Sequence, residues 1–403
     1  MKVPYRFFHI ALIVLLLTSC GNNPAKSSSN GSVKSDSTAT AKGPAPINTD
    51  AHNKYNEIAL YLAGMKSDSF SSVPAKFLNL PGYKKYCDTM TIGFNSIEKN
   101  RLSKMREWAK VEMAPELASP KTVLYPFSGP DILHCVQFFP DADQYIMVAL
   151  ERYGSLPVFE KLDSLKALVM LDYVRVSLED IFDKSYFITR KMAVNVSNQY
   201  NGFIPLASVF LVRSGYTILD IRYQHLLDDG KTFKEIPQDS MGHYLNDCVE
   251  IYFRKNGGSK IQKLAYYKTN LCDNVFATPG LKDNKGFRTY LDSLPEVYTY
   301  AKSASYLMSQ SDFNIIRNIC LTKSKTILQD DTGVGFAYYD PKKWTIKLFG
   351  SYTKPIEDFH GGYYQANLEQ AYKADPSHVK QLPFSLGYHW KDQVQNLMKF
   401  EKK

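Results

Sequence analysis

Helical periodicity or helix-forming composition marks four stretches of the chain. They cover residues 96 to 113, 157 to 183, 204 to 215 and 291 to about 321. In the first stretch, Asn95 begins a capping box and predicts the start of the helix. In the second, the residues expected to face the core are Leu162, Leu165, Val169, Tyr173 and Val176. We expect a helix in each stretch, packed through its apolar residues against the rest of the fold.

Shorter stretches rich in β-branched and aromatic residues predict strands between these helices. They lie within residues 123 to 151, 216 to 226, 248 to 272 and 326 to 352. The third stretch is expected to be a hairpin that turns at Asn256, in the sequence Asn-Gly-Gly. Strands that alternate with helices predict an α/β fold, and hairpins add antiparallel strands. We therefore expect a mixed, mostly parallel sheet with flanking helices and antiparallel hairpins.

The N-terminal residues have a different pattern. Lys2 and Arg6 precede a short apolar run from residue 11 to 17, which suits the core of a signal peptide. The run ends in Leu-Thr-Ser-Cys-Gly, where the cysteine is Cys20, and this sequence resembles the lipobox of bacterial lipoproteins. The resemblance implies a lipoprotein signal peptide at residues 1–19, cleavage before Cys20, and acylation of its thiol and new amino group. Several acyl chains together give a stable membrane anchor.

The segment after the cysteine is polar and is expected to be a tether. Residues 20–50 contain no aromatic residue and few large aliphatic ones, so they cannot bury enough apolar surface to fold. A flexible coil of this length spans roughly 30 Å. The α/β globular region is expected at residues 51–403, and the sequence allows two subdomains with a boundary near residue 200. By the sorting rule for bacterial lipoproteins, Gly21 indicates the outer membrane, and the lack of an acidic cluster favours its periplasmic side.

Charge and residue spacing narrow the classes of partner. Loss of Lys2 and Arg6 with the signal peptide lowers the formal net charge from +9 to +7. The basic residues occur in separate small groups, including Lys342 with Lys343 and the pair at residues 402 and 403. They do not form a stripe interleaved with aromatic residues, so we expect no nucleic-acid partner. The histidines are scattered and no two cysteines have CxxC spacing, so we expect no metal site.

Apart from Cys20 the chain has five cysteines, and an odd number argues against a disulfide framework. The hairpin turn at Asn256 places Cys248 opposite residues 265 to 267. Cys272 then lies roughly 17 Å further along the strand. A disulfide needs Cα atoms within about 7 Å, so we expect these two thiols to stay apart.

Residues 123 to 151 carry the first candidate chemistry, because they predict a strand, a turn, a helix and a strand that ends in an acid. This is the layout of a dinucleotide-binding or methyltransferase βαβ unit. Its turn has one glycine where the fingerprint has three, Pro130 lacks an amide donor, and Asp131 would repel an anion. The same residues suit a plain helix start, with Ser128 as the N-cap and Asp131 near the positive end of the helix dipole. We expect no cofactor.

Carboxylates offer a different chemistry. Asp131 and Glu151 both follow predicted parallel strands, and open α/β sheets collect their ligands at the carboxyl ends of such strands. Two carboxylates there could serve a hydrolase or hold a cation. Asp331 begins an Asp-Thr-Gly turn of the kind that aspartic proteases use in pairs, although one copy would need a dimer and Asp330 replaces the usual apolar residue. The candidate catalytic residues are Asp131, Glu151 and Asp331, although an ordinary polar turn explains the Asp331 sequence better than a protease motif does.

Several of these motifs together resemble a family of uncharacterised lipoproteins typical of Bacteroidetes. They are YPFSGPD from Tyr125, FFPDADQYIMVALE from Phe138, LQDDTGVGFAYY, WTIKLFGSY and LPFSLGY. The resemblance covers most of residues 120 to 400, but this chain has Ala-Leu-Glu-Arg where the family has Gly-Leu-Glu-Pro. It implies the architecture and carries no activity to transfer. We expect an outer-membrane lipoprotein that binds a glycan, another ligand or an envelope protein; the alternative is a hydrolase of envelope or glycan substrates with paired carboxylates.

Overall fold

The computed structural model describes residues 46–67, 70–117, 121–186, 202–242, 246–277, 285–356, 363–389 and 394–403. The predicted signal peptide, Cys20 and nearly all of the predicted tether lie outside the described residues. The chain from Asn48 to Lys403 forms one compact unit. In the described part of the chain, no helix has both the length and the apolar composition that crossing a membrane requires.

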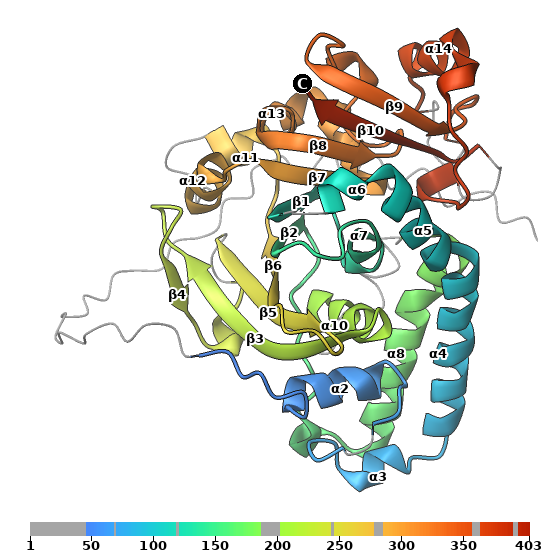
Figure 1. The fold of residues 1–403 in the computed structure, drawn as a ribbon. Coiled ribbons are helices and arrows are strands. Elements are labelled where there is room, and N and C mark those ends of the chain that lie inside the picture. Colours follow the sequence, from blue (N-terminus) through green and yellow to red (C-terminus); the bar gives the residue numbers. More distant parts are fainter. Residues whose placement is uncertain are drawn as a thin grey trace, which may run out of the picture. The chain divides into compact units, whose positions relative to one another are not determined.

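One ten-stranded sheet runs through this unit in the order β4-β3-β5-β6-β2-β1-β7-β8-β10-β9 (Figure 1). The strands are β1 (Thr122–Pro126), β2 (Gln144–Ala149), β3 (Tyr216–Leu226), β4 (Phe233–Glu235), β5 (Asp247–Lys255), β6 (Gln262–Lys268), β7 (Val297–Ala301), β8 (Ser324–Gln329), β9 (Trp344–Gly350) and β10 (Asn396–Lys402). The neighbours β6, β2, β1, β7 and β8 are parallel. The other pairs, on both sides of this parallel core, are antiparallel. The predicted α/β fold with a mixed sheet is therefore confirmed.

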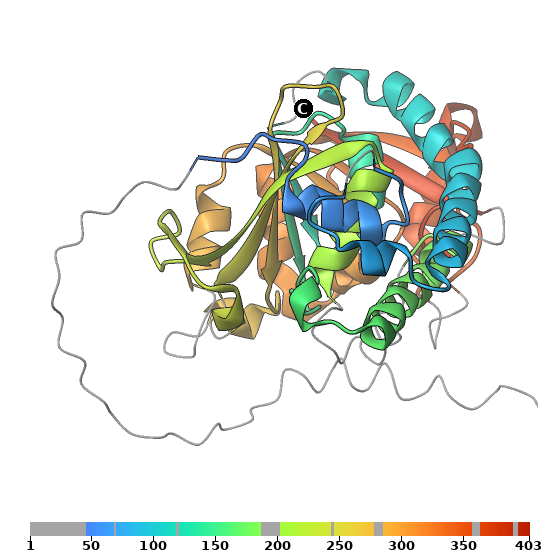
Figure 2. The same ribbon diagram turned by 90° about the horizontal axis from the view of Figure 1, so that it is seen from below.

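Helices cover both faces of the sheet (Figures 1 and 2). One face packs against α2 (Lys54–Leu62), α3 (Ala75–Leu78), α4 (Tyr83–Ile97), α5 (Ser103–Glu112), α7 (Ile132–Phe138), α8 (Ser164–Asp183) and α10 (Phe203–Arg213). The other packs against α11 (Asp273–Ala277), α12 (Lys285–Ser293), α13 (Asn314–Lys323) and α14 (Ala366–Ala374). The short helix α6 (Ala114–Leu117) follows α5. Each face of the sheet thus has its own hydrophobic core.

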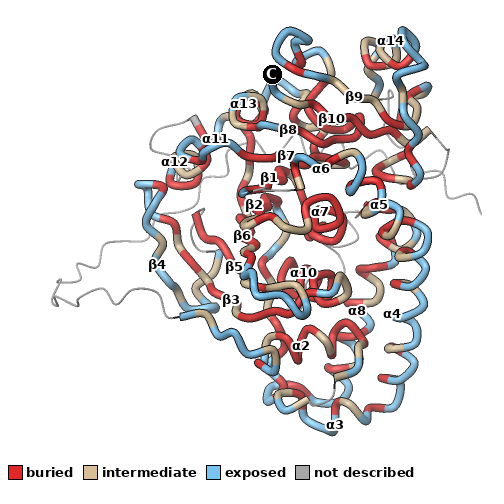
Figure 3. The backbone as a smooth tube through the Cα atoms, in the orientation of Figure 1, coloured by how far each residue is buried: buried red, intermediate tan, exposed pale blue. Residues whose placement is uncertain are grey.

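The central strands are apolar on both sides because both faces are covered. In β1, Val123 and Tyr125 belong to one core, whereas Leu124 between them belongs to the other. Every residue of β1 is buried, and buried residues run through the centre of the sheet in Figure 3. Such a strand appears in the sequence as a continuous apolar run.

The order of the parallel strands fixes where a site can form. Numbered along the chain, the five parallel strands lie in the order 3-2-1-4-5, which is that of doubly wound nucleotide-binding sheets. The order reverses between β1 and β7, so the chain leaves these two neighbours toward opposite faces. Ligands of open α/β sheets bind beyond the carboxyl ends of the strands at this switch point. We call this rim of the parallel strands the carboxyl edge.

One strand of the parallel core was missed. The helix predicted from residue 291 to about 321 is in fact the end of α12, then β7, then 3₁₀ turns and α13. The sequence of β7, Val-Tyr-Thr-Tyr-Ala, is fully buried and consists mostly of β-branched and aromatic residues. It is only five residues long and lies between two helices, so its strand character was missed, although Pro295 just before it interrupts the predicted helix.

Two helix predictions need correction. Asn95 does not cap a helix, because α4 already begins at Tyr83 and continues through a π-helical turn, η2 (Glu98–Leu102), into α5.

In α8 the predicted core face is wrong: Leu165 is 72% exposed and Val169 is 41% exposed. The residues that α8 buries are Ala167, Met170, Leu171, Val174, Ser177, Leu178, Asp180 and Ile181. This helix has two apolar faces, and packing against α4 selects the second.

The predicted hairpin is present as β5 and β6, with Cys248 paired to Tyr267 in the register. This confirms the predicted position of Cys248. All five cysteines of the described residues are free thiols, and all except Cys87 are buried.

Candidate functional site

Four segments meet at the carboxyl edge. Asp131 follows β1, Glu151 follows β2, Lys302 follows β7 and Asp331 follows β8. Parallel pairing places the ends of these strands side by side, as the sequence predicted for Asp131 and Glu151. Lys302 was not predicted, because it follows the strand that the sequence hid.

Asp131 caps helix α7. Its Oδ1 accepts a hydrogen bond from the His134 backbone N–H at 3.3 Å. The predicted N-cap, Ser128, lies three residues too early; its Oγ donates to the backbone oxygens of Gly129 and Val148 at 2.9 and 3.4 Å. The prediction that Ser128 caps this helix is therefore wrong, because the N-cap is Asp131.

The Asp131 carboxylate is the centre of a buried ionic cluster. Its Oδ1 lies 2.7 Å from Nδ1 of His134, and its Oδ2 lies 2.7 Å from Nζ of Lys302. Tyr125 donates its hydroxyl to the same Oδ2 at 3.3 Å. Lys302 also donates to the backbone oxygen of Ser185 at 2.6 Å. The side chains of Asp131, His134 and Lys302, which we call the Asp131 cluster, are at most 2% exposed.

Burial and neighbouring charges set the protonation states of this cluster. Burial alone would raise the pKa of Asp131, but the charges and hydrogen bonds of His134 and Lys302 lower it to about 2. Burial lowers the pKa of His134 to about 4, although the charge of Asp131 opposes this shift. At neutral pH Asp131 is therefore ionised and His134 is neutral, with its Nδ1–H donated to the carboxylate.

Asp330 is a second buried carboxyl at the same edge. Burial, and then the charge of Asp331, raise its pKa to about 7. Its Oδ1 accepts from the backbone N–H of Thr332 at 3.0 Å and also from the Thr332 hydroxyl. Its Oδ2 lies over Gly387, where a Cβ atom would be only 2.0 Å away, and no described residue hydrogen-bonds to it. Sequence analysis assigned Asp330 no role beyond the turn.

Asp331 points to different partners from Asp330. Its Oδ2 lies 3.2 Å from Nε2 of His389, and its backbone N–H donates to Oδ1 of Asn396 at 2.7 Å. The residue is 1% exposed. The Asp-Thr-Gly sequence forms a turn in which the Gly333 backbone N–H donates to the backbone carbonyl oxygen of Asp330 at 3.2 Å. The turn thus holds Asp331 against the C-terminal part of the chain.

Glu151 lies at the β1–α7 turn. A Cβ atom on Gly129 would lie 3.7 Å from its Oε1, so the carboxylate packs against this glycine. Its Oε2 is buried and finds no hydrogen-bond partner among the described residues. Burial raises the pKa of Glu151, and backbone N–H groups partly oppose this.

The three predicted carboxylates share an edge but not a partner. Within the described residues, no hydrogen bond or ion pair joins Asp131, Glu151 and Asp331 to one another, and no three His, Cys, Asp or Glu side chains converge as a metal ion would need. The Asp131–His134 pair resembles two members of a catalytic triad, but Nε2 of His134 is buried and contacts no hydroxyl or thiol of the described residues that could be a nucleophile. The catalytic roles of the three carboxylates therefore stay a prediction.

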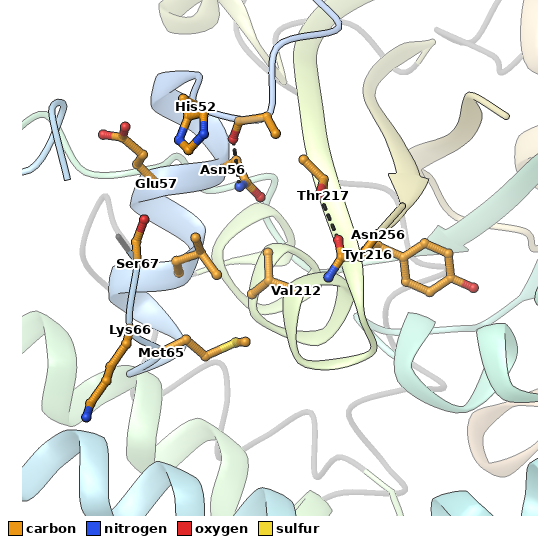
Figure 4. Close-up of a pocket in the computed structure, with 12 residues that line it drawn as sticks. His52, Asn56, Glu57, Met65, Lys66, Ser67, Val212, Tyr216, Thr217 and Asn256 are labelled. Atoms are coloured by element: carbon orange, nitrogen blue, oxygen red, sulfur yellow. Dashed lines mark hydrogen bonds between the residues drawn. The ribbon is translucent and has the colours of Figure 1, made fainter. Parts of the chain in front are cut away.

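A separate hollow lies away from this edge (Figure 4). It has a volume of about 380 Å³ and lies between α2, the end of α10 and the start of β3. Its polar walls include Asn56, which donates to Ala51, and Thr217, which donates to Asn256. None of the predicted site residues lines it.

We expect the Lys302→Met variant to be less stable than wild type by about 3 kcal/mol, because it leaves a buried carboxylate without its cation. Adding Asp131→Asn should recover part of this loss, since asparagine can still cap α7 and carries no charge. Urea unfolding of the single variants and the double variant measures the coupling.

The matched control is Lys121→Met, which removes a lysine whose pairing with Asp143 is largely exposed. It should leave the unfolding midpoint unchanged. A Lys302→Met midpoint equal to that of the control would contradict a structural role for the Asp131 cluster.

The pKa shifts of His134 and Asp330 predict opposite dependences of stability on pH. The folded state resists protonation of His134 between about pH 6.5 and 4, so this group lowers stability as the pH falls. The folded state keeps Asp330 protonated between about pH 4 and 7, where the unfolded state loses this proton. Asp330 therefore lowers the free energy of unfolding as the pH rises. Asp330→Asn should unmask the first dependence and His134→Asn the second, each with a slope of at most about 1.4 kcal/mol per pH unit.

Chemical unfolding at pH 4.5, 5.5, 6.5 and 7.5 tests this by the difference between each variant and wild type. Groups that do not interact with the substituted side chains titrate alike in the three proteins and cancel. Two difference profiles that are both flat would show that neither group is held in a shifted state.

Comparison with known proteins adds no family: neither the scan against protein-family models nor the search of curated proteins found a match to this chain.

Proposed function

We propose that this protein is a lipid-anchored protein of the bacterial outer membrane that binds a ligand or a partner and does not catalyse a reaction. The anchor is supported by the lipobox-like sequence that ends in Cys20 and by the polar segment after it. The resemblance of YPFSGPD and its companion motifs to Bacteroidetes lipoproteins supports the same assignment. Gly21 supports the outer membrane, with the body on the periplasmic side.

The observation that carries the non-catalytic role is the pairing of Asp131 with His134 and Lys302. A general acid or base must reach its substrate and exchange a proton near the working pH. Asp131 is 2% exposed, its pKa is lowered to about 2, and both of its oxygens are occupied. Its carboxylate also occupies the N-terminus of α7, where the positive end of the helix dipole would otherwise attract a cofactor phosphate. These contacts give Asp131 a structural role at the carboxyl edge.

A hydrolase remains the second candidate because of one observation, the pKa of about 7 at Asp330. A carboxyl that is half protonated near neutral pH has the property of a general acid. Against this, Asp330 is 2% exposed and one of its oxygens is packed over Gly387. A hydrolase would also need a second carboxylate on the opposite side of a substrate.

The anchor is tested by detergent partitioning of the full chain. Wild type should enter the detergent phase of a Triton X-114 separation, and Cys20→Ala should stay in the aqueous phase, because several acyl chains are lost with the thiol. Cys87→Ala, which removes a partly buried cysteine of the α/β region, is the control and should partition like wild type. Equal partitioning of wild type and Cys20→Ala would refute lipidation.

The two functions are separated by assaying the same preparation for release of reducing sugar from envelope glycans. We expect no release by wild type, and no difference between wild type, Asp330→Asn and the Asp131→Ala, Glu151→Ala double variant. Release that disappears in Asp330→Asn, at an unchanged unfolding midpoint, would establish the hydrolase instead.

A further inference from the structure

The two lateral edges of the sheet differ. At one edge, β4 has only three residues, and so it offers little backbone for another strand. At the other, β9 has seven residues, Trp-Thr-Ile-Lys-Leu-Phe-Gly, and pairs on its inner side with β10 (Figure 1). A long and partly apolar edge strand is a template for an added strand unless something covers it.

Among the described residues, the segment around Lys380 covers one end of β9. Lys380 donates its backbone N–H to the Leu348 oxygen at 3.0 Å, and its oxygen accepts from Gly350 N–H at 2.8 Å. This segment runs parallel to β9 and pairs with it at Phe349. The outer edge of β9 thus forms one isolated parallel bridge, and the hydrogen bonds to Lys380 involve Leu348 and Gly350 but not the residues before them.

The register shows which backbone groups stay open. Residues of an antiparallel edge strand point their N–H and C=O alternately toward the neighbour and away from it. Because Leu348 and Gly350 bond outward to Lys380, the even-numbered residues of β9 are the outward ones. The N–H and C=O of Ile346 and the N–H of Leu348 therefore face away from β10, and no described residue hydrogen-bonds to them.

A side-chain pocket lies beside these open groups. A hollow of about 230 Å³ is walled by Phe336, Ile346, Leu348 and Val379, with Asp375 and His378 at its polar rim. Ile346 and Leu348 are only partly buried. An open edge gives affinity through main-chain hydrogen bonds, and a pocket at alternate positions gives specificity, which is how extended peptides add to sheets.

Positive charge gathers at the start of β9. The pairing of β9 with β10 brings Lys342 and Lys343 beside the last two residues of the chain, where Lys403 N–H donates to the Lys343 oxygen at 2.9 Å. All four lysines are exposed. Lys402 and Lys403 direct Nζ to backbone oxygens at 2.7 and 2.6 Å. None of the four forms an ion pair with an acidic side chain of the described residues, although Asp340 caps the backbone of Lys342. An acidic segment would complement this surface.

We infer that the outer edge of β9 binds an extended peptide segment of another envelope protein, with an apolar side chain in the pocket and acidic residues toward the four lysines. This gives the proposed binding function its class of partner and rests on that function. A second copy of the chain fits less well. Two β9 strands paired about a two-fold axis would compete with Lys380 for Leu348, whereas the stretch from Trp344 to Leu348 suits a short segment.

The test uses the full chain in detergent and fluorescent ten-residue peptides of alternating valine and threonine preceded by three acidic residues. A second peptide carries the acidic residues at its other end, which decides whether the added strand is parallel or antiparallel to β9. The reference peptide has serine in place of valine. Fluorescence anisotropy should show at least tenfold tighter binding of one acidic valine peptide than of the reference.

Three variants test the site. Ile346→Pro removes an outward N–H together with one side chain of the pocket wall, and leaves the bonds to β10 intact, so binding should weaken at least tenfold while the unfolding midpoint changes little. Ala371, on α14, also lines the pocket, and Ala371→Leu narrows it without altering β9. This variant should also weaken binding, and it tests the site even if Ile346→Pro fails to fold. The double variant Lys342→Glu, Lys343→Glu should weaken binding and remove its salt dependence.

The controls are matched to these changes. Thr345→Gln alters the exposed neighbour on the other face of β9 without adding charge, and the double variant Lys84→Glu, Lys85→Glu makes the same charge change on α4; both should bind like wild type. Equal binding of the valine and serine peptides, or equal binding by Ile346→Pro and wild type, would overturn the inference. So would a wild-type dimer that Ile346→Pro converts to a monomer, since a second copy would then be the occupant. If wild type still entered the detergent phase, any of these results would refute the β9 site and would not refute the proposed lipid anchor.

Discussion

A carboxylate that is buried must be neutralised, and this requirement organises the carboxyl edge. Transfer of Asp131 out of water is costly, so it is stable only with its cation and hydrogen-bond donors in place. The partners come from different elements: His134 from α7, Lys302 from the end of β7, and Tyr125 from β1. Lys302 in turn bonds to Ser185, beyond the end of α8. One ionic cluster thereby joins the two strands at which the sheet order reverses, and both carboxylate oxygens of Asp131 are engaged by it.

Asp131 was predicted as a candidate site residue, but neither of its partners, His134 and Lys302, was. The spacing of Asp131 and His134 follows from the start of a helix, and the strand–turn–helix–strand pattern of residues 123 to 151 was visible in the sequence. Lys302 is separated from Asp131 by about half of the chain, and nothing in its own surroundings marks it as a partner. Its strand, β7, was predicted as helix, because a run of five buried residues fits the two-residue period of a strand and the 3.6-residue period of a helix equally well. The error in secondary structure therefore became an error in the site.

A similar limit explains the face of α8. Leu165 and Val169 have helical spacing, but so do Met170, Val174 and Leu178. Periodicity shows that a helix has an apolar face, and it cannot choose between two such faces, because that choice depends on which neighbour packs there. The Asp-Thr-Gly turn is a parallel case. Its motif directed attention to Asp331, whereas the carboxyl with the strongly raised pKa is Asp330, whose burial depends on Gly387 far along the chain. Titration depends on surroundings that a motif does not contain.

Charge distribution shows the opposite effect, in which the fold creates a feature from residues that are ordinary in the sequence. The lysine pairs at 342–343 and 402–403 are two of several small basic groups along the chain. They become one surface because β9 begins where its antiparallel neighbour β10 ends. The same pairing leaves the outward backbone groups of Ile346 without a described partner. A sheet whose carboxyl edge holds the Asp131 cluster thus keeps a lateral edge where backbone, pocket and charge are all accessible, which is why binding is better sought at β9 than at the switch point.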